Sequence, residues 1–187
     1  TLMVQTDTLQ ERLVCFTLLK DLCVTRGGEF SELIDFGNRL LQELGLDAPR
    51  ERKEVEERVL DMRTFILNHR ASQEMEAIQA LPKLKNSSKQ RIISILVEYW
   101  EAAYYLADIP LMQWAYLSII EVSFRFGNSS GSAFGYVLYG AQMVSEHRYK
   151  EAYRFGAAAL KLNHRFEDEK MLPKVHNFMA NFISPYT

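Results

Sequence analysis

The sequence predicts an all-α fold, a run of antiparallel helical hairpins with about nine helices. Apolar residues recur at intervals of three and four along most of its 187 residues, which is the period of a helix with one buried face. No segment alternates polar and apolar residues over more than a few positions, so no strands are predicted. The stretch 132–162 carries small residues on both sides of a polar break at 145–148, as two touching helices require.

Three helices are expected in the first 70 residues. The first covers about 8–24 and ends at a Gly-Gly pair. The second covers about 31–44, with Ser31 as its N-cap and a glycine just after its end. The third covers about 49–68, and its charged first half mixes both signs, which is typical of a solvated helix face.

The chain from 71 to 187 is assigned to helical repeats, separate from a less regular N-terminal part at 1–70. Six further helices are expected in it, at about 72–80, 87–107, 109–126, 132–144, 149–162 and 171–183. Asp108 and Pro110 suit the N-cap and the first turn of the helix from 109. The closing helix is expected to bury Phe178 and Phe182 with its other apolar side chains.

The hairpin at about 132–164 fits the tetratricopeptide pattern, in which small residues let two helices approach closely. Tyr136 and Gly140 stand at the tryptophan and glycine positions of that pattern. Ala152 and Ala159 stand at its two alanine positions, whereas Gly156 stands where the pattern has phenylalanine. We interpret these residues as the contacts that pack one helix of the repeat against the other.

A second unit, at about 95–128, repeats the scheme 37 residues earlier in the chain. Tyr99, Ala103, Ala115 and Val122 correspond there to the aromatic and small positions of the later unit. Two such units and a closing helix predict a tetratricopeptide-like right-handed superhelix of antiparallel helical hairpins.

Four short motifs in the second part of the chain are informative through their order and spacing. They are Ala80-Leu81-Pro82, Ala102–Leu106, Phe126-Gly127-Asn128-Ser129 and Tyr153-Arg154-Phe155-Gly156. Together they resemble the helical-repeat region of large bacterial signalling proteins, over about 74–183. Those proteins combine a serine/threonine-kinase-like domain, an AAA-type ATPase domain, this repeat region, and then GAF and often sensor histidine-kinase modules. The resemblance implies a segment of a multidomain signal-transduction protein, and the family's kinase and ATPase residues have no counterparts in this chain.

The composition argues against catalysis, cofactors, metal, nucleic acid and membrane insertion. A net charge of −2 offers no basic field for phosphates, and no apolar run is long enough to span a bilayer. The histidines are scattered without ligand spacing, and no carboxylate lies in an apolar setting that would tune a general acid. Cys15 and Cys23 stand eight residues apart, too far to pair on one helix, which fits a reducing cytoplasm.

Four aromatic residues are the candidate partner contacts, namely Tyr104, Tyr105, Trp114 and Tyr116. Core packing is the commoner role for such side chains, but those outside the core would line the concave face on which repeat proteins bind partners. The leading hypothesis is therefore a non-catalytic scaffold. It would couple a protein or peptide partner, or an effector, to neighbouring domains of a longer chain.

Other hypotheses stay open. One is an inducer-sensing helical-repeat region of an ATPase-type transcriptional activator, and another is a stand-alone adaptor protein. A third, an all-α enzyme with an unrecognised site, would need a deep pocket lined by convergent polar side chains. The first residues, Thr1-Leu2-Met3-Val4, do not resemble a natural start, so we expect a piece of a longer protein.

Overall fold

The computed structural model describes residues 8–69 and 74–186, and within them the chain is all-α, as predicted. The helices are α1 (Leu9–Arg26), α2 (Phe30–Glu43), α3 (Arg52–Asn68), α4 (Met75–Ala80), α5 (Ser87–Tyr105), α6 (Ile109–Phe126), α7 (Ser130–Ser145), α8 (Tyr149–Phe166) and α9 (Met171–Phe178). A π-helical turn at Met179–Ile183 and a 3₁₀ turn at Ser184–Tyr186 follow α9.

The second part of the chain is a stack of hairpins. Helix α7 packs most extensively against α8, and α5 against α6, while α6 also contacts α7 and α7 contacts α9. Each hairpin therefore lies beside the next, as expected for helical repeats. The right-handed superhelix stays a prediction.

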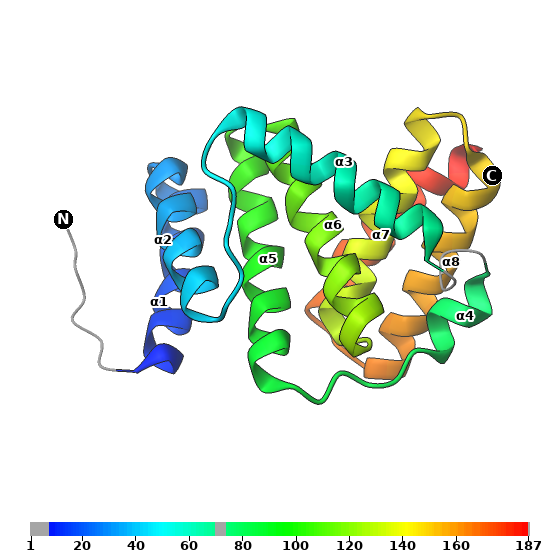
Figure 1. Ribbon diagram of the computed structural model, residues 1–187, viewed down its shortest axis with the longest axis horizontal. Coiled ribbons are helices and arrows are strands. Elements are labelled where there is room, and N and C mark those ends of the chain that lie inside the picture. Colours follow the sequence, from blue (N-terminus) through cyan, green and yellow to red (C-terminus); the bar gives the residue numbers. More distant parts are fainter. Residues whose placement is uncertain (1–7, 70–73, 187) are drawn as a thin grey trace.

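The N-terminal helices pack onto this stack. The α1–α2 hairpin lies at one end of the molecule, where α2 packs against α5, and α3 crosses α6 (Figure 1). The short helix α4 packs on α8 at the other end. One hydrophobic core runs through all of these elements, from Phe16 in α1 to Ile183 after α9. The domain boundary near residue 70 stays a prediction, and the helices on its two sides share that core.

Small residues set the closest helix contact. A Cβ added at Gly140 in α7 would lie 3.0 Å from the carbonyl oxygen of Ala152 and 3.4 Å from the amide nitrogen of Gly156, both in α8. At Gly156 an added Cβ would lie 2.6 Å from the sulfur of Met179 and 2.9 Å from a methyl carbon of Ile183. The turn after α9 thus fills the space that the phenylalanine of the repeat pattern would need.

All nine residues predicted to pack the repeats are buried. They are Tyr99, Ala103, Ala115, Val122, Tyr136, Gly140, Ala152, Gly156 and Ala159. Their burial agrees with the predicted packing, whereas the equivalence of the two units is an interpretation of their spacing.

Helix starts agree with the sequence in part. The Asp108 carboxylate accepts a hydrogen bond from the Leu111 amide at 3.1 Å, and Pro110 lies in the first turn of α6, as predicted. Ser31 is not the N-cap of α2, because that helix already begins at Phe30. The third helix begins at 52 rather than 49, and the expected residues 72 and 73 lie outside the described part of the chain.

The turn between α6 and α7 fastens the loop that follows α4. Buried Asn128 donates from Nδ2 to the carbonyl oxygen of Ile78 at 2.8 Å and accepts at Oδ1 from the Tyr136 hydroxyl at 2.7 Å. Its backbone exchanges hydrogen bonds with Pro82 and Leu84. Two motifs that are distant in sequence, at 80–82 and 126–129, therefore meet here and hold each other in place.

Candidate functional site

The candidate site is a row of six aromatic side chains, which we call the aromatic row. It comprises Phe30, Tyr105, Tyr104, Trp100, Phe178 and Phe182. Successive ring centroids lie 4.6 to 5.7 Å apart, within the range of favourable aromatic pairs. The members come from α2, α5, α9 and the turn that follows α9, so the tertiary fold alone brings them together.

Three members of the row face solvent to a large extent. Tyr104 is 57% exposed, Tyr105 is 51% exposed and Phe182 is 48% exposed. Trp100, at the centre, is buried: Tyr104 stacks on it, and it contacts Phe134 of α7 edge-on, with centroids 5.2 Å apart. The row is therefore an exposed aromatic surface on a packed base, as binding surfaces of proteins often are.

An ionic network in the same region joins three helices. Lys20 of α1 lies 2.7 Å from a Glu98 carboxylate oxygen and 2.9 Å from a Glu101 carboxylate oxygen, both in α5. Glu101 also pairs with Lys174 of α9, whose amine lies over the ring of Phe134. The network links α1 and α9 to α5, the helix that carries three members of the row.

The carboxylates of Glu98 and Glu101 stabilise the protonated, charged form of Lys20. Burial by itself lowers the pKa of a lysine, because it removes water from the ammonium group. Hydrogen bonds and charge from Glu98 and Glu101 outweigh burial, so the pKa of Lys20 is raised above its usual range. Lys20 therefore stays protonated throughout the neutral range.

The four predicted partner contacts separate into two pairs. Tyr104 and Tyr105 lie on the exposed surface, as a partner contact requires, and their role stays a prediction. The prediction is wrong for Trp114 and Tyr116, which are only 1% and 5% exposed. Both lie on α6, which is enclosed by α3, α5 and α7.

The sequence itself indicates that α6 is buried. The segment from 109 to 120 contains no charged residue, and a helix that is apolar all round is a buried helix. That signal identifies Trp114 and Tyr116 as core residues, where Trp114 packs edge-on against Tyr99.

Other members of the row were not predicted. Phe182 was expected inside the closing helix, but it is half exposed because the π-helical turn directs Ile183 rather than Phe182 into the core. Phe30 was not singled out at all, since nothing in its neighbourhood shows that it stacks on Tyr105.

Buried tyrosine hydroxyls have structural roles. Burial raises the pKa of Tyr99, Tyr116 and Tyr136, so all three stay protonated at neutral pH. The hydroxyl of Tyr99 donates to Oδ1 of Asn38 at 2.9 Å, and that of Tyr136 donates to Asn128. These phenols hold helices together.

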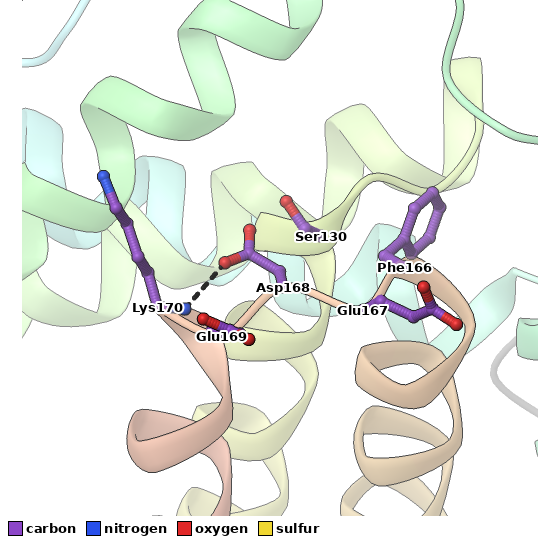
Figure 2. A pocket seen from close by; sticks show the side chains of 6 residues that line it. All are labelled: Ser130, Phe166, Glu167, Asp168, Glu169 and Lys170. Atoms are coloured by element: carbon purple, nitrogen blue, oxygen red, sulfur yellow. Dashed lines mark hydrogen bonds between the residues drawn. The ribbon is translucent and has the colours of Figure 1, made fainter.

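A shallow hollow lies at the turn between α8 and α9, beside Ser130 at the start of α7 (Figure 2). Its floor is the acidic run from Glu167 to Glu169. In the turn before α9, the Asp168 carboxylate accepts hydrogen bonds from the backbone amides of Lys170 at 2.9 Å and Met171 at 3.2 Å. The hollow is thus a hydrogen-bonded turn.

Within 8–69 and 74–186, no cluster of three or more histidine, cysteine, aspartate or glutamate side chains is arranged to hold a metal ion. In the same residues, no helix combines the length and the apolar character needed to span a bilayer. The two cysteines, Cys15 and Cys23, are free thiols.

Comparison with known proteins gives no further assignment: no family model, no curated protein and no solved structure matches this chain.

Proposed function

We propose that this chain is a non-catalytic helical scaffold that binds a protein or peptide partner over the aromatic row. The supporting observation is the exposure of Tyr104, Tyr105 and Phe182 on one surface that four separate segments build. Large, stiff aromatic side chains lose little conformational entropy on binding, and they dominate the energetics of interfaces. An isolated exposed aromatic residue would need no explanation, but a continuous row does.

The scaffold belongs, in this proposal, to a multidomain bacterial signal-transduction protein of the ATPase or kinase type, in the cytoplasm. This part of the proposal rests on the four motifs that resemble the repeat region of such proteins. The partner is then a separate protein or a neighbouring domain of the same chain. Binding at the row would be coupled to the neighbouring domains through the stacked hairpins.

The proposal is tested by selecting peptides from a display library on the purified chain and measuring their affinity by calorimetry. The variant Tyr104→Ala removes one exposed ring of the row. The matched control is Tyr153→Ala in α8, because Tyr153 is 54% exposed and lies outside the row. We expect Tyr104→Ala to weaken binding at least ~10-fold and Tyr153→Ala to leave it unchanged. Equal affinity for both variants would contradict the proposed surface.

The non-catalytic part of the proposal has its own assay. The purified chain is incubated with ATP and magnesium, and phosphate release and phosphate transfer to the chain are measured. We expect neither above the buffer blank. A turnover that rises with protein concentration would overturn the proposal.

A further inference from the structure

A second hollow lies away from the aromatic row, between α2 and the loop that leads into α3. Its lining residues are Asn38, Gln42, Asp47, Ala48, Arg50, Glu54 and Arg58. Its volume of about 310 Å³ is at the lower end of the range for small-molecule sites, and most of its lining is polar. The hollow therefore has the size and the chemistry for a small polar ligand.

Two charged residues of α3 hold the walls of this hollow. Arg58 donates one hydrogen bond to the carbonyl oxygen of Asp47 at 2.5 Å and another to the Glu54 carboxylate at 2.7 Å. Glu54 in turn accepts a hydrogen bond from the backbone amide of Arg50 at 3.1 Å. Arg58 and Glu54 thus neutralise each other and fix the loop from 47 to 50.

The amide group of Asn38 is oriented by the core. Its Oδ1 accepts the hydrogen bond from the hydroxyl of Tyr99, which is fully buried in α5. The Nδ2 group is then left as a donor at the hollow. Across residues 8–69 and 74–186, no group accepts a hydrogen bond from it.

Two opposite charges at the hollow have no ionic partner among the described residues. Neither the carboxylate of Asp47 nor the guanidinium of Arg50 forms an ion pair with any residue that the structure describes. With Arg58 and Glu54 paired, the hollow offers one cation and one anion that no described residue pairs with, and a fixed amide donor. The charges of the lining sum to zero, so the hollow complements a ligand that carries one positive and one negative group.

We propose that this hollow binds a small zwitterion of the α-amino acid class. The guanidinium of Arg50 and Nδ2 of Asn38 hold the carboxylate of the ligand, and Asp47 holds its ammonium group. Arginine is well suited to this task because its planar fork matches a carboxylate. This inference goes beyond the proposed scaffold function and does not rest on the aromatic row.

The test uses the whole chain, labelled with ¹⁵N, and each of the twenty α-amino acids as a probe at about 10 mM, well above a ~1 mM dissociation constant. We expect at least one amino acid to shift the side-chain amide signals of Asn38 in a saturable manner. The N-acetyl and methyl-ester derivatives of that amino acid each lack one charge, and they should bind at least ~10-fold more weakly. The inference is overturned if no amino acid binds, or if the derivatives bind equally well.

Two variants and one control locate the site. Asn38→Asp keeps the acceptor for Tyr99 but removes the free donor, and Arg50→Gln removes the cation from an exposed position. Lys53→Gln removes a cation three residues after Arg50 that does not line the hollow, so it serves as the matched control. We expect both variants to lose binding at least ~10-fold while the control keeps it. If Asn38→Asp fails to fold by circular dichroism, Arg50→Gln decides, and unchanged binding by Arg50→Gln refutes the site.

Discussion

The α7–α8 interface and the aromatic row differ in the size of their side chains and in how much of them is exposed to solvent. At the interface, a Cβ added at Gly140 would lie only 3.0 Å from the carbonyl oxygen of Ala152, which is tighter than an ordinary side-chain contact. At the row, Tyr104 stacks on Trp100 with more than half of its surface in solvent. A larger side chain at the interface is therefore expected to cost stability, whereas the row presents large side chains that remain about half exposed. The contrast separates residues that hold the fold from residues available to a partner.

The same contrast appears within a single helix. Tyr99 in α5 is fully buried and its hydroxyl is bonded to Asn38, but Tyr104, five positions later, lies on the surface. Substitutions on the two sides should therefore differ strongly in their effect on stability.

The largest expected effect is at Trp114, which the sequence suggested as a partner contact and the fold places in the core. Trp114→Ala should lower the free energy of unfolding by about 3–5 kcal/mol, because it leaves a cavity among α5, α6 and α7. Urea unfolding followed by circular dichroism measures the change. A loss below about 1 kcal/mol would show that this residue does not pack as described.

The next effect is at the tightest contact between helices. Gly140→Val should cost about 1–3 kcal/mol or more, because the added methyl groups meet backbone atoms of α8 that cannot move aside. The control is Ala80→Leu, an addition of similar kind at an exposed helix end. Equal midpoints of thermal unfolding for the two variants would show that α7 and α8 are not in close contact.

An effect of comparable size is expected at the turn between α6 and α7. Asn128→Leu removes the partners of the Tyr136 hydroxyl and the Ile78 carbonyl, and each buried polar group left without a partner costs about 1–3 kcal/mol. Hydrogen exchange of the backbone amide of Leu84, which bonds to the carbonyl oxygen of residue 128, reports whether the loop is released. Unchanged protection would mean that the side chain of Asn128 does not hold this loop.

The smallest effect concerns pH. The ring of His69 stacks on Phe124, with centroids 4.5 Å apart, and burial together with the charge of Arg125 lowers the pKa of His69 below its ordinary value of 6.5. Below pH 6.5 the unfolded chain therefore binds a proton more readily than the folded one, and stability falls with decreasing pH. His69→Phe keeps the stacking without the titration. Its free energy of unfolding should change less between pH 7 and pH 5 than that of the wild type, and equal changes would exclude His69 as the source.

The sequence predicts the fold where its signals are local. Asp108 and Pro110 mark the start of α6, and the spacing of Gly140, Ala152 and Ala159 identifies a close helix pair. The burial of Trp114 could also have been predicted, since no charged residue stands near it on either side.

The site was harder to predict because distant parts of the chain form it. Phe30 meets Tyr105 across 75 positions of sequence, and Glu101 joins Lys20 to Lys174. No periodicity encodes such contacts, because they depend on how whole helices pack. The hollow beside Asn38 was equally hard to predict, because the Asn38 side chain is oriented by a hydrogen bond from Tyr99, which lies in another helix.

The most direct test of the division between fold and surface is made on Tyr104→Ala, with stability and peptide affinity measured on the same sample. We expect a loss of stability of only about 0.5–1.5 kcal/mol, from the stacking on Trp100, together with at least ~10-fold weaker binding of the selected peptides. A loss of stability above about 3 kcal/mol with unchanged affinity would contradict this expectation, since Tyr104 would then be a packing residue.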